Sequence, residues 1–304
     1  MLSVDKTENL INILKTLSAE YIENEPMKNH TTFKIGGNAD IFVKVFDENA
    51  LCTVVSYCGD NDIDYFILGK GSNILVSDDG LSKVVITLDG EFKEIEVNGE
   101  TIKCGAGVAL SKLCTVALDN SLSGLEFAYG IPGSVGGATF MNAGAYGGEF
   151  KDVVSSVACL TKDGKVKTYE KGELDFSYRH SVFSDTGEIV LYTTFSLNKG
   201  EKESIKSKMD DYMFRRTSKQ PLDFPSAGSV FKRPQGNFAG TLIEKCGLKG
   251  TRVGGAEVSQ KHAGFIINAD NATCKDVEEL IKLVQKKVEE ETGYFLEREI
   301  IFLK

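Results

Sequence analysis

The fold is decided at residues 124–149, which read GLEFAYGIPGSVGGATFMNAGAYGGE and hold eight of the chain's 31 glycines. Glycine packs little and loses much conformational freedom on folding, so this density indicates backbone that needs positive φ or a close approach to another object. Ile131, Val135 and Phe140 interrupt the glycines, unlike the polar composition of a flexible linker. We therefore expect backbone N–H groups here to meet a phosphate or a flat cofactor ring.

A second glycine-rich turn lies at residues 68–80, LGKGSNILVSDDG, between two predicted strands. Successive N–H groups in such a turn form an anion-binding concavity. The turn lacks the closing GK[ST] of a phosphate-binding P-loop and the third glycine of a dinucleotide-binding fingerprint. A plain hairpin turn is the alternative. Together with residues 124–149, however, two glycine loops are suited to the two phosphates of one dinucleotide.

Four further motifs carry polar chemistry. In SYRHSVF (177–183), Arg179 is suited to a carboxylate or enolate oxygen, although a surface cluster is the alternative. In PSAGSVFKRP (225–234), no GxSxG elbow surrounds Ser229, so a catalytic role there is that of a proton donor rather than a nucleophile. A turn serine is the alternative. GGAEVSQKHAGFIIN (254–268) places His262 in a polar loop, and LERE (296–299) ends in Glu299.

Composition limits the class of protein. The 304 residues are 41% hydrophobic and 26% charged, as in soluble domains, and the net charge of −9 argues against a nucleic-acid partner. Seven cysteines without CxxC spacing predict reduced, buried thiols of a cytoplasmic protein. Three histidines without HxxxH spacing predict no metal site. No run reaches the ~18 apolar residues of a membrane span, and we expect a monomer without an obligate protein partner.

Strands and helices alternate without regular βαβ units, which predicts an α+β fold. We expect helices at residues 8–17 and 275–291, the second capped by Gly293, and a hairpin with its turn at Asp163–Gly164. We also expect a final strand over residues 295–303 and a domain boundary near Lys199.

Taken in order, GKGSNILVSDDG, the glycine-rich stretch, SYRHSVF, AGSVFK and LERE resemble the UDP-N-acetylenolpyruvoylglucosamine reductases of peptidoglycan synthesis over nearly the whole chain. The resemblance implies a vanillyl-alcohol-oxidase-type FAD-binding fold with subdomains at 1–85 and 86–198. A substrate-binding domain at 199–304 follows, with its last strand returning to the active site. No tyrosine-bearing insertion lies between Arg179 and Ser229, so the chain resembles the shorter subclass. Asn38 and Arg298 stand where proline is expected in relatives.

The resemblance also implies a reaction. NADPH reduces a non-covalent FAD, and hydride then passes to the enolpyruvyl methylene of UDP-N-acetyl-3-O-(1-carboxyvinyl)glucosamine, giving UDP-N-acetylmuramate. Arg179 and Glu299 stabilise the enolate, and Ser229 supplies the proton. Glu299 is expected to act protonated or through a shared hydrogen bond, and the protonated form requires the raised pKa that burial would supply.

The expected ligand-binding residues form two groups. Cofactor binding is expected of Gly69, Lys70, Gly71, Ser72, Asn73, Gly130, Ile131, Pro132, Ser134, Gly136, Gly137, Asn142, Gly144 and Ala145. Substrate binding is expected of Tyr178, Lys232, Arg233 and His262. Two alternatives stay open: a flavin-dependent alcohol or sugar oxidase of the same fold, and a non-catalytic protein that binds FAD or a nucleotide sugar.

Overall fold

Two hydrophobic cores organise the chain, which a computed structural model describes from residue 4 to residue 304. The first core belongs to unit 1, which comprises the chain up to Glu23, Ile41–Lys70 and Lys83–Arg215. The second belongs to unit 2, which comprises Asn24–Asp40, Gly71–Ser82 and Arg216–Lys304. The three-part division with boundaries after residues 85 and 198 stays a prediction. Within residues 4–304, no helix is both long enough and apolar enough to cross a membrane.

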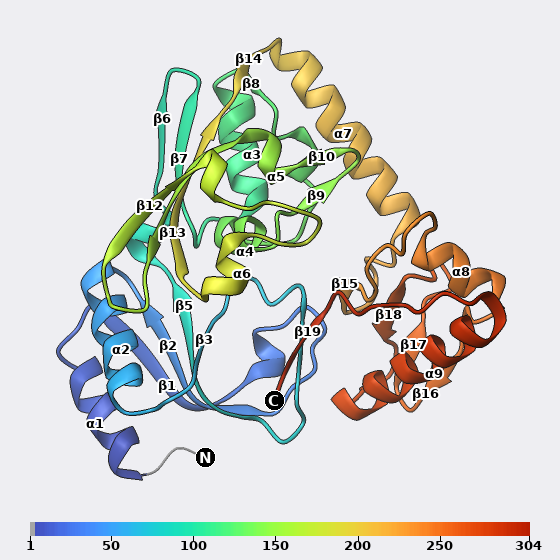
Figure 1. Cartoon of the computed structure of the whole chain (residues 1–304), viewed down its shortest axis with the longest axis horizontal. Helices are drawn as coiled ribbons and strands as arrows, with labels where there is room; N and C mark the ends of the chain where they lie inside the picture. The colour runs from blue at the N-terminus through green and yellow to red at the C-terminus, as the bar shows by residue number, and fades with distance from the viewer. Residues whose placement is uncertain (1–3) are drawn as a thin grey trace. The chain divides into compact units, whose positions relative to one another are not determined.

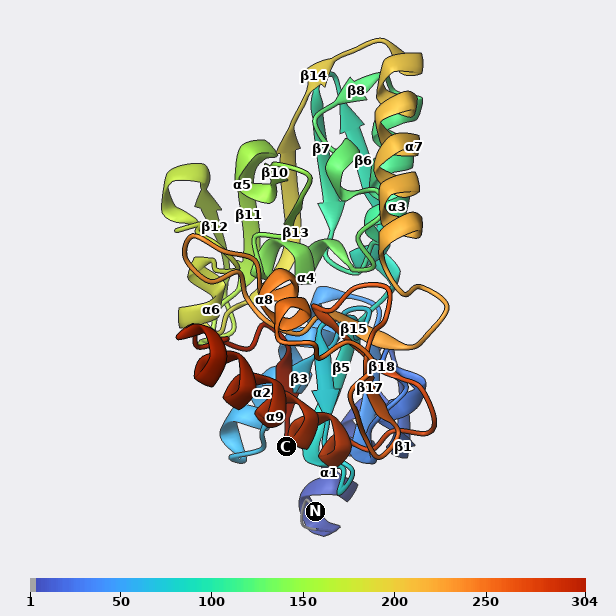
Figure 2. The same cartoon turned by 90° about the vertical axis from the view of Figure 1, so that its right-hand side faces the viewer.

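The helices and strands follow one another without a repeating unit (Figures 1 and 2). The α-helices are α1 (Val4–Leu14), α2 (Glu48–Asp60), α3 (Leu110–Asp119), α4 (Val135–Phe140), α5 (Phe150–Val153), α6 (Val182–Thr186), α7 (Lys202–Lys219), α8 (Ala239–Lys245) and α9 (Cys274–Thr292). The 3-10 helices are η1 (Met27–Asn29), η2 (Gly90–Lys93), η3 (Glu126–Ala128) and η4 (Lys171–Glu173).

The strands are β1 (Ala19–Pro26), β2 (Asn38–Val45), β3 (Tyr65–Ile67), β4 (Ile74–Val76), β5 (Leu81–Leu88), β6 (Ile95–Asn98), β7 (Thr101–Gly105), β8 (Leu122–Ser123), β9 (Gly144–Ala145), β10 (Gly148–Glu149), β11 (Val154–Leu160), β12 (Val166–Glu170), β13 (Ile189–Ser196), β14 (Asn198–Lys199), β15 (Ser226–Ser229), β16 (Arg252–Val253), β17 (Ala256–Val258), β18 (Phe265–Asn268) and β19 (Ile301–Leu303).

The largest sheet of unit 1 has the order β12-β11-β13-β7-β6, and all of its pairings are antiparallel (Figure 1). A second sheet has the order β1-β2-β5-β3. The predicted turn at Asp163–Gly164 joins β11 to β12, and Gly164 adopts the positive φ of +77° that the turn needs. The predicted α+β architecture is confirmed.

Unit 2 is built on a sheet of order β15-β18-β17-β16, against which α9 packs. Buried apolar side chains recur along α9 at helical spacing, including Val277, Leu280, Ile281 and Val284, and form the face that meets this core. Thr273 caps its N-terminus, and Gly293 ends it in the left-handed region with φ +74°, as predicted.

Two predicted elements differ from the structure. The N-terminal helix ends at Leu14, three residues before its predicted limit. The predicted strand over residues 295–303 is β19 alone, because the segment changes partner along its length. Its first part pairs through one bridge between Arg298 and Phe231, whereas Ile301–Leu303 pairs with β4. A periodicity argument sees the apolar run but not this change of partner.

Candidate functional site

The loop at residues 69–73 joins β3 to β4, but these two strands do not form a hairpin. β3 pairs with β5, and β4 pairs with β19. The plain hairpin turn considered as an alternative is therefore wrong. The loop is held through its carbonyl groups, since Gly71 O accepts the Thr32 N–H at 3.0 Å and Asn73 O accepts the Ile301 N–H at 3.0 Å.

The backbone N–H groups of the same loop are unused. Within residues 4–304, none of the five consecutive amides at positions 69–73 donates a hydrogen bond to another residue. Gly71 lies in the left-handed region with φ +61°, and a Cβ there would approach the carbonyl oxygen of His30 to 2.1 Å. Successive unpaired amides in a turn attract an anion, so this loop fits a diphosphate such as that of FAD.

In unit 1 the two glycine-rich loops meet. A Cβ added at Gly69 would lie 2.4 Å from the Oγ of Ser134, so any larger residue there would displace this side chain. Ser134 is buried and is the N-cap of α4, where its Oγ accepts the Gly137 N–H at 3.4 Å. Two of the residues predicted to bind the cofactor, Gly69 and Ser134, therefore lie close together, although they are 65 positions apart in the sequence.

The glycines of α4 serve different purposes. A Cβ at Gly136 would lie 2.8 Å from the Cβ of Ala106, so this glycine is required by packing inside the protein. At Gly137 the nearest atom to an added Cβ is the Ser134 Oγ at 3.5 Å, and the residue is exposed. The amides of Val135 and Gly136 already donate to the carbonyls of residues 108 and 106. The Gly137 N–H is used by the Ser134 Oγ, but the Cα face of Gly137 is open to a ligand, whereas that of Gly136 is filled by protein.

The remaining predicted cofactor residues of unit 1 flank α4. Gly130, Ile131 and Pro132 form the loop before it, and Pro132 is exposed. Gly144 and Ala145 form β9, which pairs with β10 across a two-residue turn. In that turn both Tyr146 and Gly147 have positive φ, +54° and +91°. The Tyr146 ring stacks on that of Tyr212, with centroids 4.6 Å apart.

Asn142 is buried and its side chain is used within the protein. Its Nδ2 donates to the carbonyl oxygen of Ser177 at 2.9 Å and to a carboxylate oxygen of Glu149 at 3.1 Å. Its Oδ1 accepts the Lys151 N–H at 2.9 Å. The Asn142 side chain thus connects the glycine-rich stretch to the segment that carries Arg179, and no sequence motif predicts this link.

Arg179 occupies the second central position of a tight turn, after Tyr178. Its φ is +57°, and its guanidinium lies 5.1 Å from the centroid of the half-exposed Tyr178 ring. Ser177 and His180, on either side of the turn, exchange backbone hydrogen bonds at 3.2 Å. Arg179 also contributes to lowering the pKa of Glu149, whose carboxylate pairs first with Lys151.

Unit 2 brings Ser229, Glu299 and Asn73 together. The Glu299 N–H donates to the carbonyl oxygen of Val230 at 2.8 Å, directly after Ser229 on the neighbouring segment. The Asn73 Nδ2 donates to the Glu299 carbonyl oxygen at 3.3 Å. Ser229 and Glu299 are both half-buried, so Glu299 is less enclosed than the sequence argument for a neutral carboxyl required. The backbones that carry Ser229 and Glu299 therefore lie side by side, although the two residues are far apart in the sequence.

The predicted substrate residues of unit 2 have partners inside the protein. The Lys232 Nζ lies 2.5 Å from a carboxylate oxygen of Glu297. The Arg233 guanidinium lies 4.6 Å from the centroid of the exposed Phe238 ring. His262 accepts the Gly264 N–H on Nδ1 at 3.1 Å, and burial lowers its pKa, so the ring is neutral at pH 7. Their roles toward a substrate stay predictions.

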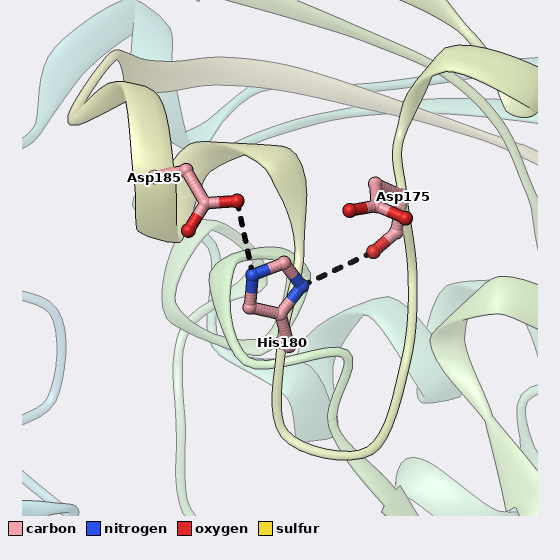
Figure 3. A group of neighbouring side chains, drawn as sticks. All are labelled: Asp175, His180 and Asp185. Atoms are coloured by element: carbon pink, nitrogen blue, oxygen red, sulfur yellow. Dashed lines mark hydrogen bonds and ion pairs between the residues drawn. The ribbon is translucent and has the colours of Figure 1, made fainter.

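Near Arg179, Asp175, His180 and Asp185 offer ligand atoms within 4.8 Å of one another, a grouping that the sequence did not predict (Figure 3). All seven cysteines are unpaired, and all except the half-buried Cys52 are buried, as predicted.

Two family models match different parts of the chain. A family model for an FAD-binding domain matches residues 39–170, and one for the C-terminal domain of UDP-N-acetylenolpyruvoylglucosamine reductase matches residues 220–303. The predicted FAD cofactor is thus confirmed.

The reductase of that name from Clostridium novyi is 48% identical over 298 residues, which are 98% of this chain and 96% of that protein. Its counterpart from Syntrophomonas wolfei is 50% identical over 277 residues, 91% and 93% of the two chains. The crystal structure of UDP-N-acetylenolpyruvylglucosamine reductase from Thermus caldophilus matches with a TM-score of 0.81 at 37% identity, covering 94% of this chain and 99% of that one. On these grounds the chain belongs to the family of UDP-N-acetylenolpyruvoylglucosamine reductases.

Proposed function

We propose that this chain uses NADPH to reduce UDP-N-acetyl-3-O-(1-carboxyvinyl)glucosamine to UDP-N-acetylmuramate, a step of peptidoglycan precursor synthesis. The observation that carries the proposal is the loop at residues 69–73. Its five amides lack acceptors within residues 4–304, and its last residue, Asn73, is hydrogen-bonded to Glu299. The expected diphosphate-binding loop is thereby hydrogen-bonded to the backbone of the residue that carries the proposed catalytic carboxyl group. The reduced thiols support a cytoplasmic location for this activity.

The residues that would hold FAD are those whose backbone is open to a ligand. They are the amides of residues 69–73 and the exposed face at Gly137. Bound FAD supplies the capacity to accept a hydride from NADPH and to pass it on to the substrate.

Arg179 keeps a positive charge at every working pH and donates two parallel hydrogen bonds to the substrate carboxylate. These bonds strengthen as negative charge develops on that carboxylate. Because an ionised carboxylate would repel an enolate, Glu299 acts there either protonated or through a shared hydrogen bond. The backbone of Glu299 is fixed on both sides, by its N–H to Val230 and by its carbonyl to Asn73, which limits where the carboxyl group can reach.

Ser229 donates a proton to the carbon next to the substrate carboxylate. β15 fixes its backbone by pairing with Phe265 of β18, and Gly228 before it has φ +75°. Electrostatic stabilisation by one aligned donor is worth about 3–4 kcal/mol, so we expect roughly a hundredfold loss of turnover or more in Ser229→Ala. Ser226→Ala, in the same strand, is the matched control and retains wild-type turnover.

The test separates the two half-reactions by anaerobic stopped-flow absorbance near 450 nm. NADPH should bleach the flavin bands at the wild-type rate in Arg179→Lys, Ser229→Ala and Glu299→Gln. Recovery of the bands on adding the enolpyruvyl UDP-sugar should be slowed in all three variants. Wild-type recovery in every variant, with full FAD occupancy, would remove the catalytic assignment. Bleaching without recovery in the unmodified protein would leave the FAD site and reject the proposed substrate.

A further inference from the structure

The Tyr178–Arg179 turn is conformationally unfavourable by itself. Arg179 has φ +57°, in the left-handed region that residues other than Gly, Asn and Asp seldom occupy. Such a residue persists only where its surroundings hold it, and unusual backbone of this kind concentrates at functional sites. The side chains that hold this turn therefore affect the orientation of the Arg179 guanidinium.

Two of these restraints lie on the flanks of the turn. On one side, the buried Asn142 donates from Nδ2 to the Ser177 carbonyl oxygen at 2.9 Å. On the other, the buried Ser181 donates from Oγ to the carbonyl oxygen of Phe140 at 2.7 Å. Both bonds tie the turn to the glycine-rich stretch, and neither depends on pH in the working range.

The third restraint is His180, the residue directly after Arg179. Its ring lies between two oxygen atoms, with Nδ1 3.2 Å from the carbonyl oxygen of Asp175 and Nε2 3.1 Å from a carboxylate oxygen of Asp185 (Figure 3). A carbonyl and an ionised carboxylate can only accept hydrogen bonds. Both ring nitrogens must therefore donate, and only the protonated imidazolium has two N–H groups. A neutral ring would turn a lone pair toward one of the two oxygens.

We propose that His180 is a positioning residue. Its imidazolium joins Asp175 to Asp185 around the Tyr178–Arg179 turn, an arrangement that we call the clamp, and so fixes the Arg179 guanidinium for the reaction. The inference rests on the proposed catalytic role of Arg179. It adds that the orientation of the Arg179 guanidinium depends on the protonation of His180.

The charges around His180 agree with this role. The hydrogen bond to Asp185 and then that to Asp175 raise the pKa of His180 above its ordinary value. Arg179, which carries a positive charge, directly precedes His180 in the sequence. From the glycine-rich stretch, Glu149 faces Arg179 and pairs with Lys151, which lowers the pKa of Glu149. Glu149 and Lys151 thus keep constant charges near neutral pH, and His180 is the group of this set that titrates there.

The first measurement follows the ring nitrogens of the FAD-bound protein by ¹⁵N NMR across pH. The chain has three histidines, and the signals that disappear in His180→Gln identify those of His180. Both nitrogens should remain protonated to a pH above the ordinary histidine value of about 6.5. Asp185→Asn should shift this titration to lower pH. An unshifted titration in the unmodified protein, or no response to Asp185→Asn, would reject the clamp.

The second measurement is the substrate-dependent recovery of the flavin bands. His180→Gln should slow recovery at pH 7 by about tenfold, comparable to the loss of one charge-assisted hydrogen bond, with flavin reduction and KM for NADPH unchanged. His180→Arg keeps two donors and a charge at every pH. It should recover most of the rate and remove the decline that the unmodified protein shows above the pKa of His180.

The outcomes separate this inference from the proposed function. A slowed Arg179→Lys with a normal His180→Gln rejects the clamp and retains the catalytic arginine. A normal Arg179→Lys rejects the role of Arg179 itself. If micromolar Zn²⁺ speeds rather than inhibits recovery of the flavin bands in the unmodified protein, and the Nε2 proton signal of His180 is lost, Asp175, His180 and Asp185 form a metal site. That outcome would also overturn the clamp.

Discussion

Gly136 and Gly137 are neighbours in α4, and the structure predicts opposite consequences for replacing them with alanine. An added Cβ at Gly136 would lie 2.8 Å from the Ala106 Cβ and 3.2 Å from the Ala106 carbonyl oxygen, so the backbone must move apart. Overpacking of this kind costs about 1–3 kcal/mol. At Gly137 the nearest atom is the Ser134 Oγ at 3.5 Å, an ordinary contact, and φ is not positive. Alanine there should stabilise the apoprotein by about 0.4–1 kcal/mol.

The effect on FAD affinity should be the reverse: Gly137→Ala should weaken binding more than Gly136→Ala does. If the cofactor lies against the open backbone of Gly137, the new methyl group displaces it. A clash of about 1–3 kcal/mol corresponds to a 5–150-fold weaker affinity, since 1.4 kcal/mol is tenfold. Gly136→Ala should weaken FAD binding only as far as it loosens α4.

The assay is urea unfolding of the flavin-stripped protein, followed by titration with FAD monitored by quenching of flavin fluorescence. Gly137→Ala should unfold at the same or higher urea concentration than the unmodified apoprotein and bind FAD at least fivefold more weakly. Gly136→Ala should unfold at lower urea. Wild-type FAD affinity in Gly137→Ala would show that this face of α4 does not touch the cofactor, and the assignment of Gly137 would have to be withdrawn.

Three further predictions concern stability and reactivity. Phe150 is fully buried and meets Phe127 and Phe195 edge to face, so Phe150→Ala should lower the free energy of unfolding by about 3–5 kcal/mol in urea titration, and a loss below 1 kcal/mol would contradict this core assignment. Only Cys52 is half-exposed, whereas burial raises the pKa of four other thiols to about 12, so native protein at pH 8 should react with one equivalent of Ellman's reagent rapidly and with the rest only on unfolding. The pKa of Asp276 is lowered because its carboxylate accepts a backbone N–H, so Asp276→Asn should destabilise the protein at pH 7 and progressively less as the pH falls below about 4, and an equal difference at pH 3 and pH 7 would refute this account.

Elements of both units could be predicted locally. The spacing of apolar residues located α9, and the left-handed Gly293 that ends it follows from the side chain that glycine lacks. The hairpin at Asp163–Gly164 was predictable for the same reason, since its turn needs positive φ at one position. These features depend on residues within a few positions of one another, which a sequence displays directly.

The site was predictable in composition but not in arrangement. The order of motifs was sufficient to indicate the family, FAD and the candidate residues Arg179, Ser229 and Glu299. It gave no sign that Asn142 fastens the Arg179 turn or that His180 bridges two aspartates, because neither contact follows a fixed spacing. It also assigned the same cofactor-binding role to Gly136 and Gly137.

Sequence by itself therefore determined which chemical groups this protein has and, through periodicity and turn residues, most of its helices and turns. Tertiary structure alone decided which glycine backbone is filled by protein and which is open, and which amides of residues 69–73 remain unpaired. It also decided that residues 295–303 change partner midway, from Phe231 to β4. The physical reason is that packing and hydrogen-bond satisfaction depend on atoms supplied by distant parts of the chain, and no local pattern specifies which of those parts will arrive.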